Sequence, residues 1–197
     1  QYKLGLLRDK NTTALDFRRI MSEMSRLMAY EATQDLKLKE RSVEGPLSNA
    51  VVKTIDVSPI VVSIMRAGNG MIESILSMLP FASAGHIGIY RDKFIDNTIE
   101  YYFRLPEKVK GLPILLVDPM VATADTAIAS IDRLKQCEVG EIKMLTILIS
   151  QTGSEKLLKH HPDVKIYTVE VEKGVNENGF LLPGIGDAGS RLYGSQN

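Results

Sequence analysis

The sequence has little cysteine, no excess of charge of either sign and no long apolar run. Cys137 is its one cysteine, which excludes an internal disulfide and a cysteine-rich zinc site. The 24 lysines and arginines balance 24 aspartates and glutamates, and a neutral chain argues against a protein that coats DNA or RNA. No apolar run approaches the roughly 20 residues of a membrane-spanning helix. We therefore expect a cytoplasmic protein that binds neither nucleic acid nor membranes, although zero net charge still allows a local basic pocket.

Common motifs of nucleotide and metal sites are missing or fail in their context. No Walker A sequence is present, which argues against that class of nucleotide triphosphatase. Residues 184–189 match G-x-G-x-x-G, but too few residues follow Gly189 for the helix and the acid that a dinucleotide site needs. Neighbouring side chains point apart, so His160 and His161 indicate a solvated helix end rather than a metal site.

The length of the chain suits one domain. Its 197 residues are enough for an α/β domain with a full core, and no internal repeat or low-complexity segment indicates a second one. We therefore predict a single domain over residues 1–197. Because the chain begins with glutamine, we expect a few N-terminal residues to be missing from it.

Residues 114–127 (ILLVDPMVATADTA) carry the most informative local pattern. The apolar run at 114–117 follows Gly111 and Pro113 and predicts a strand buried on both faces. Asp118 ends that strand, small residues follow, and a helical pattern starts at Ala127. The free N–H groups of such a turn favour an anion, and the acid before it can accept hydrogen bonds from sugar hydroxyls. The stretch therefore predicts a site for phosphate and ribose together.

Further strands alternate with helices along the chain. Apolar runs predict strands at residues 60–65, 84–89, 142–149 and 164–171. Thr13-x-x-Asp16 fits a capping box, and helical spacing behind it predicts an N-terminal helix over residues 13–36. This alternation predicts an α/β fold with a central, mostly parallel sheet flanked by helices.

Two segments depart from the alternation. Residues 90–105 are charged and then aromatic, which predicts an extended β-arm that projects from the sheet. Such an arm would serve as a dimer contact, as a flap that carries Arg91 toward a ligand, or as both. Residues 174–194 are rich in glycine and proline and predict a C-terminal loop.

Polar turns follow four of the predicted strands, at residues 66–70, 90–92, 118–126 and 151–154. Ligands of parallel α/β sheets bind at the carboxyl ends of the strands, so these turns are expected to form one site. Arginine can bind phosphate oxygens in pairs, although the turn at Arg66 would by itself fit a plain surface turn equally well. Two arginines and two turns of backbone N–H suit a ligand with more than one phosphate group.

These residues resemble a known family. Residues 117–127 resemble the phosphoribosyl pyrophosphate (PRPP) loop of type I phosphoribosyltransferases, and Asp-Pro-Met at 118–120 resembles the uracil phosphoribosyltransferase branch. Residues 6–12, 66–68, 85–92 and 183–189 are similar to the same branch, so the resemblance covers nearly the whole chain. It implies the type I phosphoribosyltransferase fold with a C-terminal base-binding loop. The implied reaction is uracil plus PRPP giving UMP and pyrophosphate, a step of pyrimidine salvage.

The resemblance also implies roles for individual residues. The residues implied to bind PRPP are Arg66, Arg91, Asp118, Pro119, Met120, Val121, Ala122, Thr123, Ala124, Asp125, Thr126 and Asp187. Those implied to bind uracil are Leu181, Gly186, Asp187 and Ala188. The catalytic set is expected to be Arg66, Arg91, Asp118 and Asp187. No protein metal site is expected, because PRPP and water would coordinate the Mg²⁺ that the family uses.

Ala124 and Asp125 depart from the family, which usually has two glycines there. Alanine costs on the order of 1 kcal/mol if the backbone must be left-handed. A carboxylate about 4 Å from a phosphate charge would cost roughly 4 kcal/mol at an effective dielectric of 20. We therefore predict that the Asp125 side chain points away from the 5′-phosphate, and that Asp125→Gly changes PRPP affinity only slightly.

Other functions stay open at this point. The altered loop also fits a regulatory protein on the same fold that senses PRPP or uracil nucleotides with reduced catalysis. A purine phosphoribosyltransferase fits less well, because Asp-Pro-Met and the C-terminal loop argue for uracil. Some family members are activated by GTP, so GTP binding and allosteric control are expectations from the resemblance alone. The aromatic arm and the N-terminal helix suggest a homodimer or a higher homo-oligomer.

Overall fold

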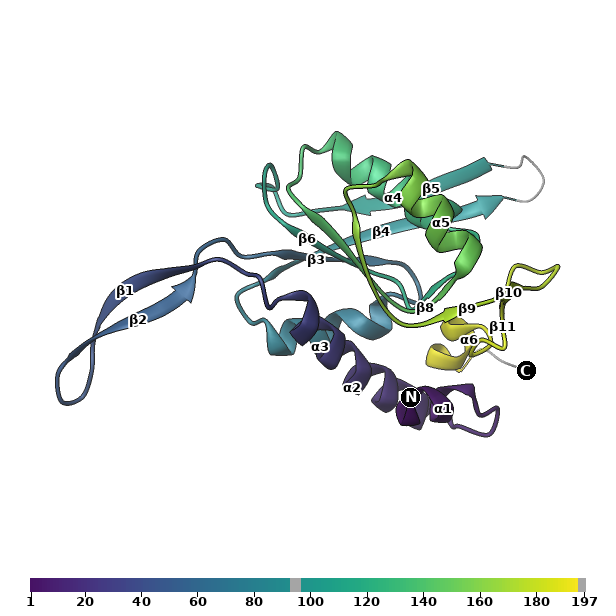
Figure 1. Ribbon diagram of the computed structural model, residues 1–197, viewed down its shortest axis with the longest axis horizontal. Coiled ribbons are helices and arrows are strands. Elements are labelled where there is room, and N and C mark those ends of the chain that lie inside the picture. Colours follow the sequence, from purple (N-terminus) through teal and green to yellow (C-terminus); the bar gives the residue numbers. More distant parts are fainter. Residues whose placement is uncertain (93–96, 195–197) are drawn as a thin grey trace.

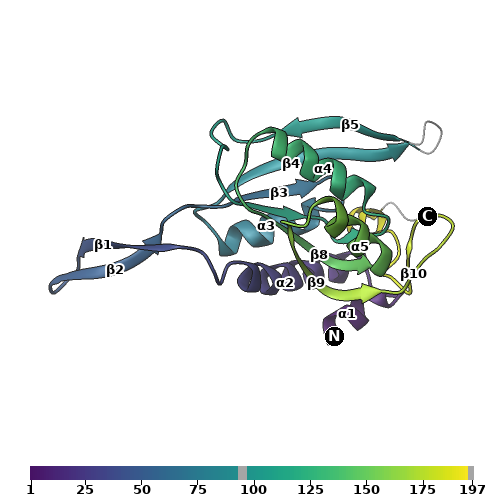
Figure 2. The same ribbon diagram turned by 45° about the horizontal axis from the view of Figure 1, so that its top comes forward.

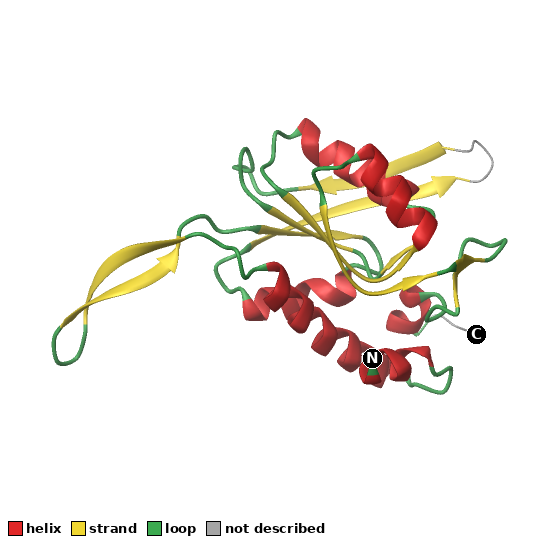
Figure 3. Ribbon diagram, in the orientation of Figure 1, coloured by secondary structure: helices red, strands yellow, loops and turns green. Residues whose placement is uncertain are grey.

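The structure is a computed structural model that describes residues 1–92 and 97–194. A seven-stranded sheet runs through its centre, and helices cover both faces (Figures 1 and 3). Its strands are β3 (Ile60–Ile64), β4 (Ser83–Asp92), β5 (Asn97–Arg104), β6 (Ile114–Val117), β7 (Met120–Val121), β8 (Ile142–Ser150) and β9 (Lys165–Glu172). The order is β5-β4-β3-β6-β8, β7 and β9 also pair with β8, and all pairs are parallel except β4 with β5.

Alternating side chains of the central strands feed two hydrophobic clusters. Val61 of β3 packs on one face of the sheet, whereas Ile60 and Val62 pack on the other. The first face is covered by α1 (Tyr2–Arg8), α2 (Ala14–Ala32), α3 (Asn69–Met78) and α6 (Ala188–Tyr193), and the second by α4 (Asp125–Gln136) and α5 (Gln151–His160). Strands buried on both faces are expected to be continuously apolar, and this is why β3, β6 and β8 were readable from the sequence.

The predicted sheet and most predicted helices are confirmed. The capping box is also confirmed, because Thr13 Oγ1 accepts the N–H of Asp16 at 3.1 Å. The N-terminal helix ends earlier than the predicted Leu36: its last residue is Ala32, and the N–H of Thr33 turns back to the carbonyl of Tyr30.

The predicted arm at residues 90–105 is a two-stranded extension at the edge of the sheet, because β3 pairs with β4 only as far as Ile87. Strand β5 pairs with β4 from His86↔Arg104 to Asp92↔Asn97, so residues 97–104 form an edge strand of the main sheet. The aromatic side chains there extend the sheet because β4 continues well past its buried part and offers a partner. Residues 93–96 of the predicted arm lie outside the described residues.

A different hairpin extends away from the body of the molecule (Figure 1). It consists of β1 (Leu38–Glu44) and β2 (Asn49–Ile55), which pair only with each other among the described strands. No element had been predicted for residues 38–55. Its strands mix charged and apolar residues without a clean alternation, since neither face packs on a core.

Helix α1 and the C-terminal segment are joined by arginine side chains. Arg191 is buried and donates hydrogen bonds to the carbonyls of Leu7, Asp9 and Ile185. Arg8 donates to the carbonyl of Gly184 at 2.9 Å. The predicted C-terminal loop therefore has a fixed shape, which includes the short strands β10 (Gly174–Val175) and β11 (Leu181–Leu182) and helix α6.

Parallel strands place the turns after β3, β6 and β8 along one edge of the sheet, and the C-terminal segment lies beside that edge (Figure 2). No helix among the described residues is both long and apolar enough to cross a membrane.

Candidate active site

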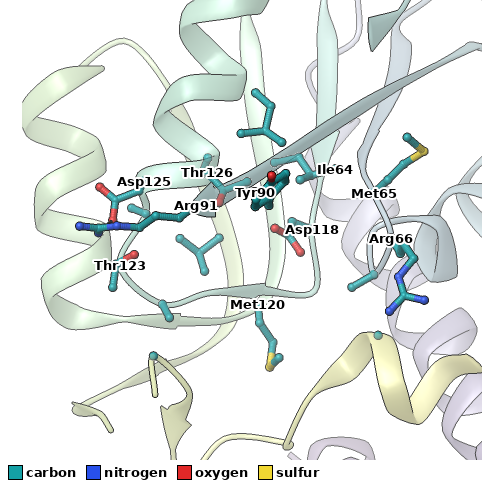
Figure 4. A pocket seen from close by; sticks show the side chains of 18 of the residues that line it. Ile64, Met65, Arg66, Tyr90, Arg91, Asp118, Met120, Thr123, Asp125 and Thr126 are labelled. Atoms are coloured by element: carbon teal, nitrogen blue, oxygen red, sulfur yellow. Dashed lines mark hydrogen bonds and ion pairs between the residues drawn. The ribbon is translucent and has the colours of Figure 1, made fainter. Parts of the chain in front are cut away.

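A cavity of about 350 Å³ opens at the carboxyl edge of the sheet. The turns after β3 and β6 line it together with the end of β4, and the C-terminal segment contributes to its rim. Residues 90–92, predicted as a turn, belong to β4. Arg66 and Arg91 lie on opposite sides of Asp118 in this cavity (Figure 4). Separate strand ends and turns therefore converge on one cavity, as expected, with Arg66 and Arg91 on either side of Asp118.

The turn that carries Arg66 packs closely against its neighbours. A Cβ atom on Gly68 would lie 2.5 Å from the carbonyl oxygen of Val117 and 2.6 Å from that of Ile64. Only glycine therefore lets the β3–α3 turn approach the end of β6. Tyr193 adds a second restraint, because its hydroxyl donates to the carbonyl of Arg66 at 3.1 Å. The exposed Arg66 side chain is thus mounted on a fixed backbone.

The loop between β6 and α4 is fixed from behind. The hydroxyl of Ser150 donates to the carbonyl of Ala122 at 2.5 Å, and a Cβ on Gly153 would lie 2.3 Å from the same oxygen. The turn at 151–154, expected to line the site, is absent from the cavity lining. It begins helix α5 and supports the loop.

Ala124 stands where a glycine was expected, and its backbone is left-handed, with φ 64° and ψ 1°. Ala124 is the N-cap of α4, and residues 123–126 line the cavity. The first N–H groups of α4 therefore face the cavity. A helix N-terminus of this kind favours an anion.

Asp118 stands in the floor of the cavity, directly after β6. It is half-buried, and desolvation raises the pKa of its carboxyl to about 7, although a hydrogen bond from the N–H of Met120 acts in the opposite direction. A carboxylate in this place can accept hydrogen bonds from ligand hydroxyls and adds negative charge near neutral pH.

Asp125 is fully engaged by cations. Arg91 binds its Oδ2 atom, and Lys156 Nζ lies 2.5 Å from its Oδ1 atom. Burial acts to raise the pKa of Asp125, but the hydrogen bonds with Lys156 and Thr123 and the charge of Arg91 outweigh it, so the pKa is lowered. The side chain is therefore ionised at neutral pH. Its predicted direction relative to a bound 5′-phosphate stays a prediction.

Pro119 and Asp187, also predicted to bind PRPP, differ in their placement. Pro119 is buried, and its carbonyl accepts the N–H groups of Ile147 and Leu148. Asp187 lines the cavity and caps α6 by accepting the N–H of Gly189 at 2.9 Å.

Of the four residues predicted to contact uracil, Asp187 lines the cavity, whereas Leu181, Gly186 and Ala188 do not. Leu181 and Ala188 are buried in the core, and Gly186 has a left-handed φ of 74°. Gly179 and Gly189 line the cavity instead. The uracil contacts predicted for Leu181, Gly186, Asp187 and Ala188 stay predictions.

Several lining residues lie outside the predicted turns and site residues: Ile64, Met65, Ile89, Ala127, Gly179 and Gly189. Most of them are immediate neighbours of predicted ones, so the strand ends themselves were the available signal. Gly179 had no such signal, because only the folding of the C-terminal segment brings it near β6.

Comparison with known proteins identifies the family. A sequence model of uracil phosphoribosyltransferase matches residues 1–195. A curated uracil phosphoribosyltransferase from Polaromonas naphthalenivorans is 46% identical over all of this chain and 94% of its own length. The chain belongs to the uracil phosphoribosyltransferase family.

Solved structures show the same fold. The AQ2163 protein of Aquifex aeolicus superposes with a TM-score of 0.92 at 29% identity, over 98% of this chain and 92% of that one. Adenine phosphoribosyltransferase from Thermoanaerobacter pseudethanolicus shares the fold at 12% identity, with a TM-score of 0.55 over 80% and 84% of the two chains. The type I phosphoribosyltransferase fold is therefore confirmed.

The raised pKa of Asp118 predicts a pH-dependent stability of this family member without ligand. Between about pH 4 and pH 7 the folded state binds more protons at Asp118 than the unfolded state does, so its contribution to stability falls as pH rises. Asp118→Asn lacks this loss. The free energy of unfolding of the variant, relative to that of the native protein, should therefore rise by roughly 2 kcal/mol from pH 5 to pH 8, after allowance for solvent screening. Urea unfolding at both pH values measures the difference, and a constant difference contradicts the assignment.

Proposed function

We propose that this chain transfers the phosphoribosyl group of PRPP to uracil, giving UMP and pyrophosphate. The observation that supports this most is the cavity at the carboxyl edge, where a helix N-terminus and two arginines stand around Asp118. The 5′-phosphate would bind at the start of α4, the ribose hydroxyls at Asp118, and the pyrophosphate beside Arg66. Family membership supplies the base and the reaction.

The chemistry needs positioning rather than a protein nucleophile. The bond from the anomeric carbon to pyrophosphate breaks while a bond to a uracil nitrogen forms, through an oxocarbenium-like state, and that nitrogen gives up its proton to the departing pyrophosphate or to water. Rate enhancement then comes from orientation of the two substrates and from stabilisation of the departing negative charge. Arg66 and Arg91 are the cations of the cavity suited to that second task.

The C-terminal segment would select the base. A backbone carbonyl that faces uracil N3 accepts its hydrogen, whereas the corresponding atom of cytosine presents a lone pair. Leaving buried polar groups unpaired gives strong discrimination. The contacts of Arg8 and Arg191 with the carbonyls of Gly184 and Ile185 support this proposal, because they fix the shape of the loop.

Mg²⁺ would enter with PRPP. Among the described residues, no group of three or more His, Cys, Asp or Glu side chains could coordinate a metal. Asp125 is occupied by two cations and Asp187 by the N-terminus of α6, so Asp118 is the cavity carboxylate best placed to contact the ion or its waters. Mg²⁺ typically keeps several waters and bridges substrate phosphates, and it would stabilise the pyrophosphate as it leaves.

One assay separates the candidate functions. The chain is incubated with PRPP and Mg²⁺ and with uracil, adenine, guanine or hypoxanthine in turn, and nucleotide products are separated by chromatography. We expect UMP and none of AMP, GMP or IMP. Adding GTP to the same assay measures activation, which is predicted from the resemblance only.

A PRPP- or uracil-nucleotide-sensing regulator is the second candidate, and the ion pair of Arg91 with Asp125 favours it, since that arginine is held away from a ligand. Binding of PRPP without turnover of any base would support the regulator and remove the enzyme hypothesis. A purine nucleotide product would contradict both. A cytoplasmic location stays a prediction.

We also propose a homodimer or a higher homo-oligomer, supported by the β1–β2 hairpin. An isolated two-stranded hairpin is marginally stable in water. Here Leu47 at its tip is 98% exposed and Val51 is 69% exposed. A second copy of the chain would cover these side chains. Sedimentation velocity should show an oligomer for the native chain and a monomer when residues 38–55 are replaced by a short turn. A native chain that sediments as a monomer contradicts the proposal.

A further inference from the structure

The carboxylate of Asp125 binds one cation with each oxygen. Arg91, at the end of β4, contacts Oδ2, and Lys156, on the second turn of α5, contacts Oδ1 at 2.5 Å. Figure 4 shows Asp125, Arg91 and Thr123 together at one side of the cavity. The Asp125 side chain is only 20% exposed, whereas the two cations are each 41% exposed. Two elements other than α4 thus compensate one partly buried negative charge.

Asp125 stands in the wall between two cavities. The first is the candidate active site, and the second, of about 240 Å³, lies between α4, α5 and the β4–β5 edge. Arg91 and Asp125 line both cavities, but Lys156 lines only the second. Lys156 therefore attracts the carboxylate from the side opposite the loop that would receive the 5′-phosphate.

The charges explain why such a partner is needed. A carboxylate in the first turn of α4 competes with a phosphate for the same N–H groups and repels it. Arg91 cannot both neutralise Asp125 and bind the substrate through the same N–H groups. If Arg91 moved to a substrate phosphate and Asp125 had no other cation, a partly buried charge would be left unpaired, which is strongly unfavourable.

We propose that Lys156 is a positioning residue of the phosphoribosyl site: it keeps the Asp125 carboxylate turned out of the phosphate-binding loop, and it keeps that carboxylate paired when Arg91 leaves for the substrate. This inference rests on the proposed function, and it deepens it by naming a residue outside the cavity that sets PRPP affinity. Lys156 and Asp125 thus act as one unit, an acid at the start of α4 with a dedicated counter-ion on α5.

A double-mutant cycle tests the pair. Lys156→Met should raise the KM for PRPP roughly tenfold, with kcat and the KM for uracil within about twofold of the native values. Asp125→Asn is the second background, because without the carboxylate Lys156 has nothing to position. Lys156→Met in that background should raise the KM for PRPP by less than about twofold. Lys156→Arg should restore most of the affinity in the native background.

Lys159→Met is the matched control. Lys159 is exposed on the same helix, and its loss changes the net charge by the same amount. It should leave the KM for PRPP unchanged. Thermal unfolding of all variants checks that α5 is intact.

An equal loss in both backgrounds would show that Lys156 acts directly on the phosphates and would overturn the proposal. No loss for Lys156→Met would overturn it as well. Turnover by the native chain tests the proposed function separately. The same cycle can be measured as PRPP binding by calorimetry if turnover is absent, so the two failures are distinguishable.

Discussion

Close packing of backbone at the carboxyl edge of the sheet is the constraint on which the site depends. Gly68 lets the turn after β3 touch the end of β6, and Gly153 lets the start of α5 touch the loop after β6. A side chain at either glycine would force the turns apart by roughly half an ångström to an ångström, and errors of that size are costly where catalysis depends on orientation. The cavity is therefore shaped by backbone contacts, and its polar side chains are mounted on that frame.

The second requirement is to compensate the negative charge of three acidic side chains that lie beside an anionic substrate. Asp118 meets it by desolvation, which raises its pKa to about 7 and makes the neutral form accessible near neutral pH. Asp125 meets it by pairing, since Arg91 and Lys156 lower its pKa. Asp187 meets it by capping α6, where the N–H groups of Gly189 and Ser190 take up its charge. Each acid of the site thus has its own form of compensation.

The sequence predicted those parts of the fold that follow from local patterns. Buried parallel strands such as β3 and β8 are continuous apolar runs, and Thr13 with Asp16 marks the start of α2 unambiguously. It indicated the β4–β5 extension but not the β1–β2 hairpin, because exposed β-prone residues look alike whether they extend a sheet, as β5 does, or leave the body, as β1 and β2 do. Pairing partners distant in the chain decide between the two.

The candidate site was predictable to a similar extent. Arg66 and Asp118 follow β3 and β6, Arg91 lies at the end of β4, and the parallel fold brings such ends together. The role of Lys156 could not be foreseen, because the residue lies 31 positions from Asp125 and is one of many lysines on solvated helices. The same holds for Arg191, whose burial depends on the meeting of both ends of the chain.

The central claim is that turns from separate strands bind one PRPP molecule at the carboxyl edge. A crystal structure with Mg²⁺ and an unreactive PRPP analogue tests it most directly. We predict the 5′-phosphate at the N-terminus of α4, the ribose hydroxyls at Asp118 and the pyrophosphate beside Arg66. An analogue bound elsewhere, or bound with its pyrophosphate at α4, would contradict it.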